Sequence, residues 1–315
     1  MRRTDQAVEW PTILVFCAAY GIWALGTTVI WSVSPVLAVI VTMLAVALQS
    51  SLQHEVLHGH PFRSRHLNEA LVFPPLGLLY PFGRFRDLHL AHHFDPNLTD
   101  PYDDPESNFQ DPSVWARLSP MHRALLWANN TLLGRILLGT AIGGWAFLRS
   151  DFAAISSGNR AAQRDWALHL AGLVLVGLWL GLMAEMPVWA YLLAAYGGNS
   201  LIKIRTFLEH RAHEAHRART VVVEDRGPLA YLFLNNNLHV VHHCHPNVAW
   251  YDLPALYRAN RDHFLRRNEA YVYRSYGQIF RQYFLRAKDP VPHPIWPVKK
   301  GQPDTPACEV VRAAE

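Results

Sequence analysis

The sequence predicts an all-α integral membrane protein with four transmembrane helices in two hairpins, a cytoplasmic histidine-rich helical cap and interfacial helices. Three observations predict this fold: long uncharged regions, basic residues confined to one side of them, and histidines grouped at helical spacing. Only 17% of the 315 residues are charged, against about 25% in typical soluble domains. We therefore expect much of the chain to lie in lipid.

The first hairpin follows from a run without Asp, Glu, Lys or Arg between Trp10 and Gln53. This run is about twice as long as the ~20 apolar residues that one membrane-spanning helix needs. Polar residues and a proline interrupt it at Ser32-Val33-Ser34-Pro35. The sequence therefore predicts two spans, at about 11–32 and 35–54.

The second hairpin is predicted from two more apolar stretches, Trp166 to Ala184 and Met186 to Ile202. Only Glu185 and Pro187 mark the joint between them. We place spans at about 166–184 and 186–205. Buried helices of a soluble protein are the alternative, but such helices rarely stay uncharged over this length.

The orientation follows from the basic residues, because cytoplasmic flanks of membrane spans carry an excess of Lys and Arg. The two tight joints, Trp31 to Pro35 and Ala184 to Pro187, contain neither residue. Both termini and the polar regions should therefore be cytoplasmic.

Two other apolar segments are not expected to span. The stretch from Ala70 to Gly83 is too short and contains Pro74-Pro75, so it should lie in the interface or enter the membrane and return. The stretch from Thr131 to Leu148 is apolar except for Arg135, which fits an interfacial helix with a snorkelling arginine. Between them, Asp95 to Pro112 is acidic and rich in Pro and Asn, which predicts a loop.

The chain should form one membrane domain over residues 1–287, followed by a tail, 288–315, that is rich in proline and has no apolar period. We expect this tail to be largely disordered, with little role in the chemistry. Cys17, Cys244 and Cys308 form no Cys-x-x-Cys pair and should be unpaired thiols in a reducing compartment.

The histidines are the strongest functional signal. Many of the 18 histidines gather in three boxes, "HEVLH", "HLAHH" and "HVVHH". Spacings of three and four place side chains on one face of a helix, close enough to share a metal. The box residues are His54 and His58, then His89, His92 and His93, then His239, His242 and His243.

Eight imidazoles exceed the four ligands that one zinc ion takes, so we expect two metals. A shell rich in nitrogen suits iron, copper, nickel or zinc. His210, just past the end of the fourth predicted span, is the candidate for a ninth ligand.

The first box also contains His-Glu-x-x-His, the pattern of helical zinc proteases in which the glutamate is the general base. A membrane zinc metalloprotease built on His54, Glu55 and His58 is therefore a remote alternative. It leaves the two other boxes unexplained. We instead expect Glu55, Asp87 and Glu209 to be candidates for the hydrogen bonds that metal-bound histidines need at their second ring nitrogen.

The boxes, as "HEVLH", "HLAHH" and "NNLHVVHHCHP" around two helical hairpins, resemble the membrane fatty acid desaturase family. That family also includes acyl hydroxylases, carotenoid ketolases and hydroxylases, and alkane hydroxylases. The resemblance implies a non-haem diiron enzyme that uses O2 and two electrons to attack an unactivated C–H bond. It assigns the eight box histidines, and His210 less closely, as iron ligands, with no catalytic residue beyond the metal centre. For an asparagine near the metal, it leaves Asn199, Asn236 and Asn237 as candidates.

The stretches "HHFDPNLTDPYDDPES" and "HPNVAWYDLP" are similar to those that follow the second and third boxes in bacterial acyl-lipid desaturases. The resemblance therefore favours a fatty acyl desaturase of lipid metabolism, with an acyl or carotenoid hydroxylase or ketolase as the near alternative. No Gly-x-Gly-x-x-Gly fingerprint, haem motif or cysteine cluster is present. A separate electron donor, a ferredoxin or a cytochrome with its reductase, is expected, and a nucleic-acid partner is not.

Overall fold

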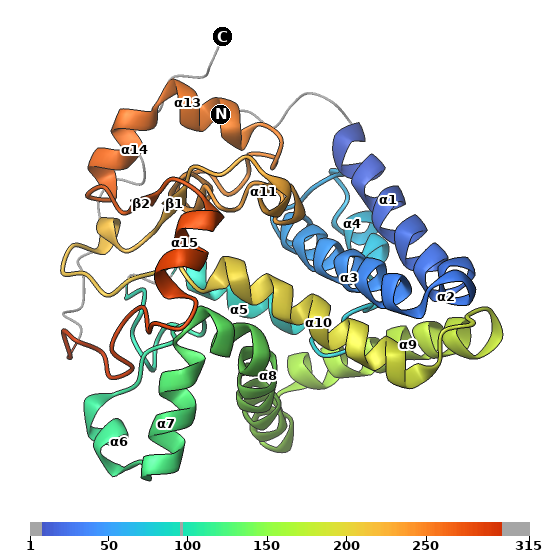
Figure 1. Ribbon diagram of the computed structural model, residues 1–315, viewed down its shortest axis with the longest axis horizontal. Coiled ribbons are helices and arrows are strands. Elements are labelled where there is room, and N and C mark those ends of the chain that lie inside the picture. Colours follow the sequence, from blue (N-terminus) through green and yellow to red (C-terminus); the bar gives the residue numbers. More distant parts are fainter. Residues whose placement is uncertain (1–7, 95–96, 298–315) are drawn as a thin grey trace. The chain divides into compact units, whose positions relative to one another are not determined.

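The computed structural model describes residues 8–94 and 97–297. They form two compact units. We call the one made of residues 8–87 and 139–202 the hairpin unit, and the one made of residues 88–94, 97–138 and 203–297 the loop-rich unit. Nearly all regular structure in the described residues is helical (Figure 1), as the sequence predicts.

The hairpin unit is built from long helices: α1 Trp10–Thr27, α2 Val29–Val33, α3 Pro35–Leu57, α4 Arg65–Leu71, α9 Arg160–Leu182, and most of α8 Leu132–Ser156 and α10 Val188–Thr206. The loop-rich unit contains the end of α5 Phe82–Phe94, then α6 Pro112–Arg117, α7 Pro120–Asn129, the 3-10 helix η1 His216–Ala218, α11 Pro228–Leu232, α12 His239–Cys244, α13 Leu253–Ala259, α14 Arg261–Arg267 and α15 Tyr276–Tyr283. Its strands β1 Val222–Val223 and β2 Val272–Tyr273 pair in parallel.

The predicted first hairpin is present, with α1 packed along α3 (Figure 1). Its break lies where the sequence placed it, because Ser34 caps α3 by accepting a hydrogen bond from the backbone N–H of Leu37 at 3.3 Å, and Pro35 occupies the first turn. The two helices approach closely at Gly26. A Cβ atom there would lie 2.5 Å from Oγ1 of Thr42, so this contact requires glycine.

Four described helices, α1, α3, α8 and α9, are long and apolar enough to cross a membrane. The helix α10, over the predicted fourth span, is not among them, since it carries polar and basic residues such as Asn199 and Lys203. The helix α8 extends eight residues beyond the predicted interfacial stretch, which ended at Leu148. Arg135 within it is buried and donates to the backbone oxygen of Asn129 at 2.8 Å. The guanidinium of Arg135 thus finds a hydrogen-bond acceptor inside the protein.

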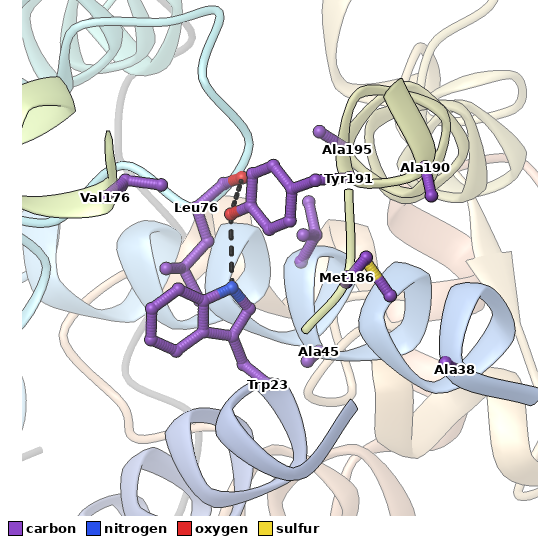
Figure 2. Packing of buried hydrophobic residues seen from close by; sticks show 10 residues of the cluster. Trp23, Ala38, Ala45, Leu76, Val176, Met186, Ala190, Tyr191 and Ala195 are labelled. Atoms are coloured by element: carbon purple, nitrogen blue, oxygen red, sulfur yellow. Dashed lines mark hydrogen bonds between the residues drawn. The ribbon is translucent and has the colours of Figure 1, made fainter. Parts of the chain in front are cut away.

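The core of the hairpin unit is a cluster of aromatic, aliphatic and small residues (Figure 2). Small side chains permit close helix contacts, which is the usual packing between helices in membranes. The hydroxyl of Tyr191 accepts a hydrogen bond from Nε1 of Trp23 at 3.1 Å and donates to the backbone oxygen of Leu76 at 2.9 Å. The cluster contains Trp23, Ala38, Ala45, Val46, Leu76, Val176, Met186, Ala190, Tyr191 and Ala195.

The segment between Leu71 and Leu78 is irregular, and side chains of four helices satisfy its backbone. This arrangement fits the predicted segment that enters and returns, because irregular backbone at membrane depth needs polar partners. The hydroxyl groups of Tyr20 and Tyr191 donate to the backbone oxygens of Leu71 at 2.6 Å and Leu76 at 2.9 Å. The side-chain amides of Gln49 and Asn199 donate to the oxygens of Pro74 at 2.5 Å and Gly77 at 2.9 Å, and Nε2 of His169 donates to that of Leu78 at 3.0 Å. Oε1 of Gln49 also accepts from the backbone N–H of Leu76 at 3.1 Å.

Two expectations about the C-terminal region need correction. The start of the predicted disordered tail, residues 288–297, is part of the described structure, where it belongs to the loop-rich unit and hydrogen-bonds to Gln110 and Asn130. Cys244 is disulfide-bonded rather than a free thiol, whereas Cys17 is a free, exposed cysteine as expected. Cys308 and the rest of the tail, 298–315, lie outside the described residues.

Candidate metal centre

Seven of the nine predicted ligands belong to the loop-rich unit, on three elements. The second box lies at the end of α5, the third forms α12, and His210 follows α10 in a β-bridge with Thr220. Within α5 and α12 the spacing of three and four residues turns the histidines to one face, as predicted. The rings collect into two clusters, which we call the four-histidine cluster (His92, His210, His239, His243) and the three-histidine cluster (His89, His93, His242).

The four-histidine cluster is joined through its Nε2 atoms. The Nε2 atom of His210 lies 2.9 Å from that of His92 and 3.2 Å from that of His239. The Nε2 atom of His239 lies 3.2 Å from that of His243. Each residue of the cluster offers one nitrogen, and these nitrogens all lie within 4.8 Å of one another.

The three-histidine cluster has the same arrangement. The Nε2 atom of His93 lies 3.0 Å from that of His89 and 3.1 Å from that of His242. The two clusters are adjacent, because the rings of His93 and His243 stack with centroids 4.2 Å apart. The loop-rich unit thus offers two neighbouring sets of nitrogen ligands, as the ligand count predicted.

Acceptor side chains hold the opposite ring nitrogens. Nδ1 of His92 lies 2.7 Å from Oδ1 of Asp104, and Nδ1 of His89 lies 2.8 Å from Oε1 of Glu106. A carboxylate only accepts hydrogen bonds, so each Nδ1 must carry the proton. The matching Nε2 atoms then present lone pairs to the cluster, which is the tautomer that a metal requires.

The third box has an analogous partner in Asn236, whose Oδ1 lies 3.2 Å from Nδ1 of His239. The amide Nδ2 of Asn236 donates to Oε1 of Glu209 at 3.4 Å, and Oε1 of Glu209 also lies 3.7 Å from Nδ1 of His239. The charge of Glu209 is balanced by Arg205 at 2.8 Å. Glu209, a predicted hydrogen-bonding candidate, and Asn236, one of the asparagines expected near the metal, therefore both lie beside a cluster histidine.

These distances fit bound metal ions. Two unprotonated ring nitrogens about 3 Å apart repel each other, and a cation between them removes that repulsion. Ring nitrogens that bind one metal with bonds of about 2.1 Å are roughly 3 to 3.4 Å apart. The observed separations of 2.9 to 3.2 Å are close to this range. Histidine nitrogen suits iron, copper, nickel and zinc alike, so the donor set alone does not select among them.

Burial and the outer carboxylates act in opposite directions on the histidines. Burial lowers the pKa of His92, but Glu106 and Asp104 outweigh it and raise the value to about 9. Burial, together with the charges of His89 and His92, lowers the pKa of His93 to about 2. Burial likewise holds the pKa of His239 well below its usual range. His93 and His239 therefore favour the neutral form that binds metal, whereas the raised pKa of His92 favours a charged ring that must release its Nε2 proton when a metal binds.

The loop after α5 is shaped around Asp104. Its Oδ2 accepts from the backbone N–H of Thr99 at 2.8 Å, and its Oδ1 accepts from the backbone N–H of Glu106 at 2.9 Å. The side chain of Asp104 is 1% exposed. One carboxylate thus organises the loop and holds a cluster histidine. The sequence predicts this loop but not its role, although acidic residues directly after a histidine box are a signal that could have indicated it.

The remaining predicted site residues belong to the hairpin unit. His54 lies in the last turn of α3 and His58 caps its end, with ring centroids 4.9 Å apart. Glu55, which lies between these two histidines in the sequence, is also buried. Asp87 pairs with Arg86 at 2.7 Å, rather than with a box histidine as the sequence suggested. The reason is that residues two apart on a helix do not share a face, so Asp87 and His89 diverge.

Comparison with known families gives a result that agrees with this geometry. The chain matches the family model described as fatty acid desaturase over residues 30–275. That range is well over half of the 315 residues and contains all three boxes and His210. No curated protein matches the chain. With four helices suited to spanning a membrane and two clusters able to hold metal, the chain belongs to the fatty acid desaturase family, a family of lipid-modifying oxidoreductases.

Proposed function

We propose that the protein is an O2-dependent diiron oxidase that introduces a double bond into a fatty acyl chain in the membrane. Membership of the family supports a lipid substrate and redox chemistry. The observation that carries the proposal is the pair of adjacent histidine clusters, in which Nε2 atoms converge while acceptors hold the Nδ1 atoms.

The ligand assignment follows from the clusters. We propose that the four-histidine cluster binds one iron and that the three-histidine cluster binds the other. His54 and His58, paired at the end of α3, would complete the second set, as the family resemblance implies. Bound there, two iron ions would supply the activation of O2 and the removal of hydrogen from an unactivated C–H bond.

The chain's own residues orient and tune this centre. Asp104, Glu106 and Asn236 fix the planes of three rings and keep the proton on Nδ1. Such outer hydrogen bonds raise the basicity of a metal-bound histidine. All nine proposed ligands are histidines, which as neutral side chains would hold iron without adding negative charge of their own. The acidic side chains Glu55, Glu209 and Asp104 then act on the ligands and not on the substrate.

We further propose that the centre and both termini face the cytoplasm, where a ferredoxin or a cytochrome with its reductase would deliver electrons. The proposal on sidedness rests on the absence of Lys and Arg from the two tight joints. The variant Ser32→Cys, labelled in intact cells, tests this orientation. An introduced cysteine in that joint should react with an impermeant reagent added outside, and protection there would contradict the proposed orientation.

Two measurements test the chemistry. The purified protein should contain about two iron atoms per chain, since nine nitrogen ligands exceed the needs of one metal. With an electron donor and O2, it should convert a fatty acyl lipid into a product lighter by two hydrogen atoms. A product that has gained one oxygen atom, labelled from isotopic O2, would instead establish the hydroxylase alternative. A product that has gained the oxygen and also lost two hydrogen atoms would establish the ketolase. Full activity with zinc and without iron would refute the diiron proposal.

A substitution separates the oxidase from the remote zinc-protease alternative. In a protease, Glu55→Gln removes the general base, so peptide hydrolysis is abolished while the metal stays bound. In the oxidase, Glu55 contacts no reacting atom, and we expect retained iron with a loss of activity of up to ~10–100-fold. Peptide cleavage that depends on Glu55 would overturn the proposed function.

A further inference from the structure

The segment 288–297 pairs with the loop that follows α5. The backbone N–H of Gln110 donates to the oxygen of Val291 at 2.9 Å, and the N–H of His293 donates to the oxygen of Gln110 at 2.8 Å. An aromatic contact extends this pairing, because the ring centroids of Trp296 and Tyr102 are 5.8 Å apart. We call residues 288–297 the strap.

His293 connects the strap to the interior of the loop. Its side chain is buried, with the residue 2% exposed, and its ring packs on Phe109 at 4.8 Å between centroids. The backbone N–H of Ile295 donates to Nδ1 of His293 at 3.3 Å, so the proton of the neutral ring is on Nε2. That Nε2 lies 3.2 Å from Oγ1 of Thr99 and donates to it. Burial lowers the pKa of His293, which favours the neutral ring.

Thr99 passes this contact on to a cluster histidine. Its backbone N–H donates to Oδ2 of Asp104 at 2.8 Å, and Oδ1 of the same carboxylate holds Nδ1 of His92 at 2.7 Å. A continuous chain of hydrogen bonds thus runs from His293 through Thr99 and Asp104 to His92. Displacement of Thr99 would rotate the carboxylate of Asp104 and, with it, the plane of the His92 ring.

The other end of the strap reaches a second member of the same cluster. Nζ of Lys288 donates to the backbone oxygen of His210 at 2.7 Å, and its side chain is 7% exposed. The ammonium also pairs with Asp289 at 2.8 Å, and the backbone N–H of Lys288 donates to the oxygen of Asn130 at 3.0 Å. A buried, paired lysine fixes the backbone on which the His210 ring is mounted.

We propose that the strap is a positioning element for the four-histidine cluster, and that Lys288 and His293 are positioning residues for His210 and His92. The proposal rests on the proposed function only in requiring that this cluster binds iron. Both strap residues act on the four-histidine cluster through the contacts above. Asp104 also accepts from the backbone N–H of Glu106, which holds His89, so we expect a smaller effect on the three-histidine cluster than on the four-histidine cluster.

Truncation provides the first test. A chain ending at Pro297 keeps the strap and should hold iron like the full chain, whereas a chain ending at residue 287 lacks it. We expect the shorter chain to release one of its two iron ions to a chelator ~10–100-fold faster, the range found for outer hydrogen bonds to metal ligands. Equal release rates from the two truncated chains would overturn the proposal.

Point variants and Mössbauer spectroscopy give the sharper test. In His293→Ala, the signal of one iron should shift clearly more than that of the other, and His293→Gln, which restores a donor, should recover most of the original spectrum. The exposed His66→Ala is the matched control. If His293→Ala does not fold, Lys288→Met preserves the buried stem and should shift the same iron signal. Unchanged spectra in the folded strap variants would refute the strap's role, whereas a wild-type protein without iron would refute the proposed function instead.

Discussion

Replacement of Asp104 by asparagine should weaken metal binding at the four-histidine cluster. The two oxygens of Asp104 accept three hydrogen bonds, from Nδ1 of His92 at 2.7 Å and from the backbone N–H groups of Thr99 and Glu106 at 2.8 and 2.9 Å. Asparagine has one acceptor oxygen, so its NH2 group must face at least one of these donors. A hydrogen bond to a charged group contributes about 1.5–3 kcal/mol. This corresponds to a roughly 10- to 150-fold weaker hold on the metal.

The assay is the rate at which the purified, iron-loaded protein transfers iron to an excess of chelator, followed by the absorbance of the chelate. Asp103→Asn is the matched control, because Asp103 is the adjacent residue of the same loop, is exposed, and accepts from Asn97 at 3.3 Å. Asp104→Asn should release one iron ion ~10–100-fold faster than the control. If the two variants release iron at the same rate, the reasoning that the carboxylate orients His92 is wrong.

Three further predictions concern stability. Gly26→Ala should destabilise the fold by about 1–3 kcal/mol, since its Cβ would overlap a side chain of α3, whereas Gly21→Ala on the same helix meets nothing and should not lower the melting temperature. Tyr191→Phe should cost about 1–3 kcal/mol in a thermal melt, because a buried carbonyl oxygen and an indole N–H lose their partner. Hydrogen bonds from Arg261, with Tyr257, lower the pKa of Glu224 in the folded protein, so its stabilisation is present above the unfolded pKa and is lost as the pH falls through the folded one. The melting temperatures of the wild type and Glu224→Gln should therefore differ near neutral pH and converge in acid; a constant difference would contradict this.

Much of the membrane architecture could be predicted because its signals are local. The uncharged run from Trp10 to Gln53 and its break at Ser34-Pro35 correspond to α1, α2 and α3. The helix α8 was harder to interpret, because Arg135 makes its start look interfacial. Its backbone partner, Asn129, lies in the preceding helix, and a hydrogen bond of this kind is set by the fold and not by periodicity. Apolar length predicts a helix well, but it does not reveal how a single charge inside it is satisfied.

The inner part of the candidate site was predictable, and the outer part mostly was not. Histidines at spacings of three and four must share a helix face, so box residues such as His89 and His92 could be grouped from sequence alone. Asp104 and Glu106 lie in a loop without periodicity, and their positions depend on contacts that only folding creates. The strap was misjudged for the same reason. Proline content favours disorder in isolation, yet His293 is buried against a loop almost two hundred residues earlier in the chain.

Charge gives a physical reason for the acidic loop. Neutral imidazoles do not compensate divalent cations, and burying uncompensated positive charge is costly. In the proposed diiron centre, Asp104 and Glu106 would supply negative charge beside the ligands His92 and His89, where it would lower that cost. Glu209 is the third acidic side chain near the clusters. Burial raises its pKa, the charge of Arg205 opposes that shift, and the same arginine balances part of its negative charge. Asp104 and Glu106 follow the second box in the sequence, and their negative charge lies beside His92 and His89. Removing either carboxylate of that loop should raise the reduction potential of the iron it serves, because the more oxidised ion has the greater need of a nearby anion.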